Sequence, residues 1–163
     1  YKGYRVAYCT TGSIFTYQYS HAWIDFRKLY DEFPENSEFS SPGLETGFNY
    51  YNNSVNAVRA NRQFCIDNST VYKTYGENSW ALSACLGPDG YKSYGAKPGA
   101  ALNDGTIPPY GMASSIVFNP IESLNGLKNL YAKHRKFLYG KYGFKDLGVS
   151  IIPVFLFRGI VLN

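Results

Sequence analysis

Apolar residues recur with the period of a helix most clearly between Asn119 and Gly140. Asn119 can cap the start of this helix, Pro120 suits its first position, and Glu122 stands at its third position as in a capping box. Gly140 is a natural stop. The periodic positions are Leu124, Leu127, Leu130, Tyr131, His134, Phe137 and Leu138.

Three further helices are predicted with less pronounced patterns. One begins at Ser20 and is limited by Pro34, with an apolar stripe of Trp23, Phe26, Leu29, Tyr30 and Phe33. A second covers Ser54 to about Ile66. A third, short helix covers about Asn78 to Cys85 and stops at Gly87-Pro88.

The segments between these helices read as loops. Glu35 to Asn53 and Asp89 to Pro109 are rich in Gly, Pro, Ser and Asn. Loops of such length inside a compact domain are usually functional or disordered, and the tyrosines argue against disorder. No segment predicts a strand as clearly as these patterns predict helices. The chain is therefore expected to be mainly α, with helix pairs joined by long loops.

Composition adds that this is one ordinary domain with an unusual share of tyrosine. The 163 residues include 16 tyrosines, and aromatic residues make up 18%. Tyrosine offers a flat apolar face and a hydroxyl group, which suits a sugar-binding surface, although tyrosines also line helix interfaces. The net charge is only +4, and the single basic cluster, Lys133 to Lys136, is typical of a solvated helix face. Nucleic-acid binding therefore has little electrostatic support.

The cysteines and the C-terminal segment exclude other classes. Cys9, Cys65 and Cys85 have no CxxC spacing, so neither a zinc site nor a disulfide framework is predicted. The apolar run from Gly148 to Asn163 is shorter than the roughly 20 residues of a spanning helix, and Pro153 and Arg158 interrupt it. No membrane anchor is expected.

Candidate chemistry gathers between Tyr75 and Tyr94, where acidic, amide and aromatic residues alternate with glycines. Glycoside hydrolysis needs two carboxyl groups, one to protonate the leaving oxygen and one to activate water or attack. Desolvation of a glutamate beside Trp and Tyr favours the protonated form that a general acid requires. The four acidic candidates are Asp25, Glu77, Asp89 and Asp104.

Each of these carboxylates also has a purely structural interpretation. Asp25 could pair with Arg27, and Glu77 could interact with a helix N-terminus. Asp89 and Asp104 each precede a glycine and could be turn residues.

The two histidines favour ligand contact or packing over metal binding. His21 stands in a polar and aromatic cluster and could hydrogen-bond a ligand, whereas His134 lies on the apolar stripe of the last helix. No partners at metal-ligand spacing accompany either histidine. Neither GxSxG nor a neighbouring Cys/His pair is present to suggest nucleophilic catalysis.

Five blocks in order make the chain resemble the glycoamylase-like family. That family includes bacterial endo-β-1,2-glucanases and is similar to domains of cyclic β-1,2-glucan synthases. The blocks are QYSHAWIDFR (18–27), NRQFCIDN (61–68), YGENSWALSACLGPDGYKSYGAKPG (75–99), NDGTIPPYGMASSIVFNP (103–120) and YGKYGFKD (139–146).

The resemblance implies an (α/α) toroid of six helical hairpins that hydrolyses a β-1,2-linked glucan without metal or organic cofactor. The family's active-site glutamate matches Glu77, which would be the general acid, with Asp25 as the second carboxylate. A bacterial secreted or periplasmic location is also implied by the family alone. Substrate contacts are expected from His21, Tyr75, Trp80, Asp89, Tyr91 and Asp104.

The chain departs from the family pattern at several positions. Leu86 stands where the family usually has Asp, Ala81 where it has Gly, and Pro108 where it has Ala. The resemblance ends at Asp146, so residues 1–146 are interpreted as part of the toroid and residues 147–163 as a divergent apolar tail.

A full toroid of twelve helices needs about twice this length, so a fragment is expected. Its uncovered half-barrel face would then favour self-association. Two alternatives to an enzyme remain: a degenerate glucan-binding module, and an α-helical interaction protein without a carbohydrate ligand.

Overall fold

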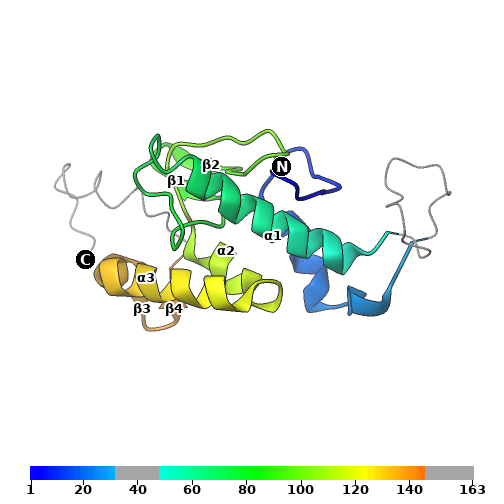
Figure 1. Cartoon of the computed structure of the whole chain (residues 1–163). Coiled ribbons are helices and arrows are strands. Elements are labelled where there is room, and N and C mark those ends of the chain that lie inside the picture. The colour runs from blue at the N-terminus through cyan, green and yellow to red at the C-terminus, as the bar shows by residue number, and fades with distance from the viewer. Residues whose placement is uncertain (32–47, 146–163) are drawn as a thin grey trace.

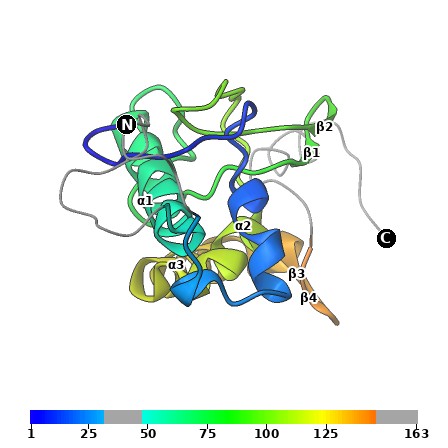
Figure 2. The same cartoon turned by 90° about the vertical axis from the view of Figure 1, so that its right-hand side faces the viewer.

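The computed structural model describes residues 1–31 and 48–145. Its longest elements are α1 (Tyr50–Asp67) and α3 (Pro120–Leu138), with the short helix α2 (Pro109–Ser114) lying between them (Figure 1). In the turned view α2 lies to the right of α1 and close to α3 (Figure 2). The remaining elements are the 3-10 helices η1 (Ile14–Tyr17), η2 (Tyr19–Ala22), η3 (Phe26–Lys28) and η4 (Ser115–Val117), and the strands β1 (Cys85–Gly87), β2 (Gly90–Lys92), β3 (Tyr139–Gly140) and β4 (Gly143–Phe144).

The prediction of a mainly helical chain is confirmed, with four strands that the sequence did not indicate. These strands form two antiparallel hairpins, β1 with β2 and β3 with β4. The described residues contain three α-helices and not the twelve of a six-hairpin toroid, so the complete toroid stays a prediction. None of the helices in the described part of the chain is long and apolar enough to cross a membrane.

The helix predicted at Ser54 begins four residues earlier, at Tyr50. Asn49 caps it, because its side-chain oxygen accepts a hydrogen bond from the Asn52 amide at 2.8 Å. The Asn49 amide group also donates to the carbonyl of Leu29 at 2.9 Å, which ties the helix start to the preceding segment. The predicted end is nearly correct, since α1 stops at Asp67.

The helix predicted from Asn119 to Gly140 is confirmed as α3, and its periodic stripe is buried in part. Leu130 and Leu138 lie in the core, and Leu127 and Phe137 pack against it, together with the small residues Ser123 and Gly126 that the pattern did not include. Leu124 and Tyr131 of the predicted stripe are 46% and 41% exposed. Self-association through an uncovered half-barrel face stays a prediction.

The helix predicted from Ser20 to Phe33 is wrong over its described part. Two 3-10 turns, η2 and η3, replace it, and residues 32–33 lie outside the described residues. The first turn ends at Ala22, and Asp25 caps the start of the second, because its carboxylate accepts a hydrogen bond from the Arg27 amide at 3.1 Å. Trp23, expected on the buried stripe, is 88% exposed.

The short helix predicted over Asn78 to Cys85 is also wrong. Residues 80–84 form no helix and are buried without interruption at the centre of the molecule. The side chain of Asn61 on α1 pairs with the backbone of Leu82, accepting from its amide at 2.9 Å and donating to its carbonyl at 3.1 Å. The Leu82 carbonyl also accepts from the Ile14 amide at 3.1 Å. The buried backbone is thereby satisfied without a helix.

The loop predicted from Asp89 to Pro109 holds β2 and leads directly into α2, which the sequence reading missed. Pro109 occupies the first turn of that helix. Gly111 lies against the central segment, where a side-chain carbon at position 111 would come within 2.5 Å of the Ala81 carbonyl oxygen. This close approach places α2 directly on residues 80–84.

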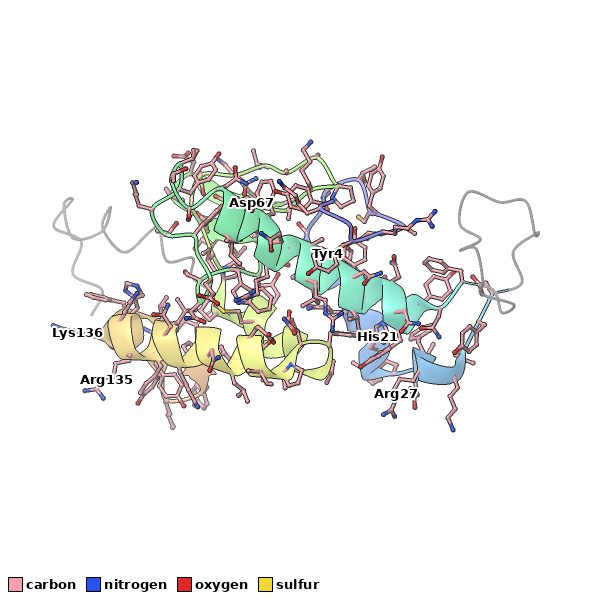
Figure 3. The ribbon with its side chains drawn as sticks, in the orientation of Figure 1. Tyr4, His21, Arg27, Asp67, Arg135 and Lys136 are labelled. Carbon is pink, nitrogen blue, oxygen red and sulfur yellow. The ribbon has the colours of Figure 1, made fainter. Side chains whose placement is uncertain are left out.

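The N-terminal segment docks on α1 and η4 through His21. Its Nε2 atom lies 3.0 Å from the Ser54 hydroxyl, and its ring packs on Phe26 and Phe118 at centroid distances of 4.7 and 4.9 Å. Figure 3 shows His21 beside the N-terminal half of α1 and Asp67 towards its other end. Burial lowers the pKa of His21 below its ordinary value of 6.5, against a smaller opposite effect of Asp25.

Ala81→Gly is expected to stabilise the protein. Ala81 has φ +74°, in the left-handed region that an L-residue enters at a cost and glycine enters freely. Relief of this strain exceeds the added flexibility of the unfolded chain, so the free energy of unfolding should rise by about 0.5–1 kcal/mol. Chemical denaturation measures it. Ala84→Gly, at a buried position without positive φ, should be destabilising, and equal losses in the two variants would contradict the argument.

Stability is expected to fall as the pH drops below about 6.5. Burial lowers the pKa values of both His21 and His134, so the unfolded chain binds more protons than the folded chain in this window. Thermal unfolding between pH 7.5 and 5 measures the effect. His21→Gln should reduce the loss, and a melting temperature that is constant or rises towards pH 5 would contradict it.

Candidate active site

The predicted central block begins with a turn from Tyr75 to Ser79 that connects α1, α3 and a distant loop. Gly76 and Ser79 pair as an isolated β-bridge. Tyr75 is buried, and its hydroxyl donates to the Asn103 side-chain oxygen at 2.6 Å. Burial raises the pKa of this phenol well above its ordinary value of 10.0, so it remains a hydrogen-bond donor.

Glu77 projects from this turn and is held by Arg62 of α1. The Arg62 guanidinium contacts the Glu77 carboxylate at 3.2 Å and donates to the Glu77 carbonyl oxygen at 3.1 Å. The next residue is also fixed, because the Asn78 carbonyl accepts from Asn129 of α3 at 2.9 Å. The Glu77 side chain is 75% exposed. The desolvation expected beside Trp and Tyr is therefore not provided by the described residues.

Trp80 supports the turn from behind and does not offer a sugar-binding face. Its side chain is fully buried in the hydrophobic core. Gly126 of α3 packs near the indole, and a side-chain carbon at position 126 would clash with the Met112 sulfur. The indole nitrogen and the buried Ser123 hydroxyl have no hydrogen-bond partner among the described residues.

Asp89 and Tyr91 lie on the β1–β2 hairpin and point to solvent. Asp89 pairs with Lys92 at 3.2 Å, and its side chain is 80% exposed. Tyr91 is 67% exposed and stands opposite Leu86, itself 42% exposed. Leu86, which replaces the family's usual Asp, thus places an apolar side chain on the surface of the hairpin.

Asp104 closes a turn and accepts a hydrogen bond from a buried tyrosine. Its carboxylate accepts from the Thr106 amide at 2.9 Å and from the Tyr94 hydroxyl at 2.7 Å. Burial, aided by the bond to Asp104, raises the pKa of Tyr94 to about 12. The hydroxyl of Tyr94 also occupies the space where Gly87 would otherwise carry a side chain, which joins this turn to the hairpin.

Asp25 forms a two-pronged ion pair with Arg27. The two carboxylate oxygens accept from Nε at 2.8 Å and from Nη2 at 2.7 Å. This hydrogen bonding lowers the pKa of Asp25 to about 2. Both side chains are exposed, with relative areas of 60% for Asp25 and 68% for Arg27. The ion pair with Arg27 that was one interpretation of Asp25 is therefore present, and the carboxylate lies at the surface.

The structure brings some of the predicted residues together and separates others. Tyr75 contacts Asn103, the neighbour of Asp104, and Thr74 donates to the Gly105 carbonyl, so these two turns form one cluster.

His21 lies elsewhere along α1. It contacts Ser54, whereas Glu77 contacts Arg62, and eight residues of helix separate these anchors by about 12 Å. The described residues do not bring Asp25 and Glu77 together as a carboxylate pair.

The sequence reading missed several residues that shape this region. None of Asn61, Arg62, Tyr94 and Asn103 was predicted as a site residue. Their partners are 15 to 28 residues away in the sequence, apart from the Tyr94–Asp104 contact across ten residues. Only the unusual density of polar residues in the blocks pointed to them. No group of three His, Cys, Asp or Glu that could hold a metal ion occurs within residues 1–31 and 48–145.

Comparison with known proteins identifies relatives that act on β-1,2-linked glucans. The chain is 30% identical over 142 residues to the exo β-1,2-glucooligosaccharide sophorohydrolase (non-reducing end) of Parabacteroides distasonis. That match covers 87% of this chain and 18% of the relative. The chain therefore spans less than a fifth of this curated protein.

Two solved structures share the fold over most of the chain. An endo-β-1,2-glucanase from Chitinophaga pinensis, in complex with sophorotriose and glucose, superposes with a TM-score of 0.66 at 31% identity, covering 83% of this chain and 28% of the other. A β-1,2-glucanase from Parabacteroides distasonis superposes with a TM-score of 0.69 at 29% identity, covering 86% and 18%.

The model of the Glycoamylase family, described as "Putative glucoamylase", matches residues 1–147. This range includes all five sequence blocks and every predicted site residue. The chain belongs to the Glycoamylase family.

Proposed function

We propose that the chain is part of a glycoside hydrolase that cleaves a β-1,2-linked glucan. The observation that carries the proposal is the shared sequence of about 30% identity with a sophorohydrolase and with endo-β-1,2-glucanases across more than four-fifths of the chain. The Tyr75–Trp80 turn supports it, because it presents an exposed carboxylate from a firmly anchored backbone.

Glu77 is proposed as the proton donor to the glycosidic oxygen. Its exposure leaves the carboxyl group accessible to a substrate, and bound glucan would supply the desolvation that favours the protonated acid. After proton transfer the carboxylate is left negative, 3.2 Å from the Arg62 guanidinium. Arg62 therefore stabilises the product form of the acid and keeps its backbone in place.

The second carboxyl group comes, in this proposal, from outside the described residues. In glycosidases the two groups lie roughly 5–5.5 Å apart for retention and 6.5–9.5 Å apart for inversion. The anchors of Glu77 and of the His21–Asp25 segment are about 12 Å apart along α1 alone. The relatives are several times longer than this chain, which leaves ample room for another carboxylate. Asp25 then serves as a substrate contact.

Glu77→Gln is expected to lower the rate of β-1,2-glucan hydrolysis at least about 100-fold, because a general acid commonly contributes two to four orders of magnitude. The assay measures the release of reducing sugar from β-1,2-glucan by the protein that contains this sequence. Glu122→Gln, at a half-buried position in the first turn of α3, should retain hydrolysis near the unsubstituted rate.

A non-catalytic glucan-binding module is the competing function. The exposed Leu86 in place of an acidic residue and the separation of Glu77 from Asp25 favour it. Binding of β-1,2-glucan without product release, unchanged by Glu77→Gln, would establish this module and contradict the proposed hydrolase.

A further inference from the structure

The turn that carries Glu77 is closed by a pair of backbone hydrogen bonds. The Gly76 amide donates to the Ser79 carbonyl at 2.9 Å, and the Ser79 amide donates to the Gly76 carbonyl at 3.1 Å. Because peptide groups are planar, these bonds fix the peptide planes at the two ends of the turn. The carbonyl groups of residues 77 and 78 lie between them and are bonded from outside the turn.

Side chains from two helices bond these middle carbonyl groups. Arg62 of α1 donates to the Glu77 carbonyl at 3.1 Å, and Asn129 of α3 donates to the Asn78 carbonyl at 2.9 Å. The Glu77 side chain leaves the backbone between the planes fixed through the carbonyls of Gly76 and Glu77. Asn129 fixes the plane that follows, so the turn is held against α3 as well as against α1.

Asn129 separates the position of the turn from its charge, which Arg62 does not. Arg62 also contacts the Glu77 carboxylate at 3.2 Å, so its loss would change both. The Asn129 side chain is neutral, half-buried, and bonded to the backbone of the next residue. The helix α3 itself is anchored in the core by Leu130 and Leu138. Removal of the Asn129 amide should therefore leave the helix packed and release only the turn.

We propose that Asn129 is a positioning residue for hydrolysis, which holds the Asn78 carbonyl and thereby keeps the Glu77 carboxyl group aimed at the glycosidic oxygen. The inference rests on the proposed role of Glu77 as proton donor and deepens it. Proton transfer needs the donor at hydrogen-bond distance, and a displacement of about 1 Å can lower a rate about 100-fold. Asn129 lies outside all five sequence blocks, so the family resemblance gives it no role.

Steady-state hydrolysis of β-1,2-glucan by the protein that contains this sequence tests the inference. Asn129→Ala is expected to lower kcat at least about tenfold and to leave KM within about twofold, because the substrate contacts remain. Asn129→Gln, which keeps an amide donor, should recover part of the loss. Asn125→Ala is the matched control, since Asn125 is exposed one turn earlier on the same helix and should retain the unsubstituted rate. All three variants should melt within about 3 °C of the unsubstituted protein.

The combination of Asn129→Ala with Glu77→Gln gives a readout that a purely structural role would not move. A residue that acts only through Glu77 has little left to change once the carboxylic acid is gone. The double variant should therefore hydrolyse β-1,2-glucan within about twofold of the rate of Glu77→Gln alone. Independent effects would instead multiply and lower the rate at least about tenfold further.

Four outcomes would overturn the inference. A raised KM with unchanged kcat would make Asn129 a substrate contact, and multiplying losses in the double variant would show that it acts independently of Glu77. A melting temperature of Asn129→Ala that falls together with kcat, without recovery in Asn129→Gln, would assign Asn129 a structural role. An unchanged kcat in Asn129→Ala would remove its role altogether. In each case a low rate in Glu77→Gln would leave the proposed hydrolase standing, whereas a full rate in Glu77→Gln would overturn the proposed function and the inference together.

Discussion

The hydrogen bonds between Asn61 and Leu82 are the constraint on which the rest of the structure depends. Residues 80–84 run through the core outside any helix or strand, where an unpaired backbone group would be costly. The Asn61 side chain satisfies Leu82 in the manner of a neighbouring strand, at 2.9 and 3.1 Å. The Leu82 carbonyl also accepts a hydrogen bond from Ile14 of η1, and α2 packs on Ala81 through Gly111. One amide side chain thereby connects α1 to elements before and after it in the sequence.

The same part of α1 also organises the candidate active site. Asn61 points into the core, and its neighbour Arg62 points outward to Glu77. The buried segment and the exposed turn that carries Glu77 are therefore fixed by adjacent residues of one helix. Trp80, at the boundary, fills the core behind the turn and leaves the carboxylate in front of it. Rigid support from a buried segment is what a positioned catalytic group requires.

The sequence predicted the features that local patterns determine. The periodicity of residues 54–66 and 119–140 is a property of neighbouring residues, and both helices are present, although the predicted cap Asn119 makes no side-chain hydrogen bond. Residues 78–85 form no helix, and the distant Asn61 holds their backbone in the core through Leu82. The helix after Ser20 failed because Asp25 caps a second turn. Likewise, the sequence blocks predicted Glu77 and Tyr75 as site residues. Their partners Arg62 and Asn103 are distant in the sequence, and only the fold brings them into contact.

Amide hydrogen exchange at Leu82 tests the central role of the buried segment most directly. Leu82 lies outside every helix and strand, yet its amide is bonded to Asn61 in the core. We expect the Leu82 amide to exchange only by global unfolding, as slowly as the core amides of α1. We expect Asn61→Ala to abolish this protection from exchange. Exchange at the rate of the exposed loops in the intact protein would contradict it.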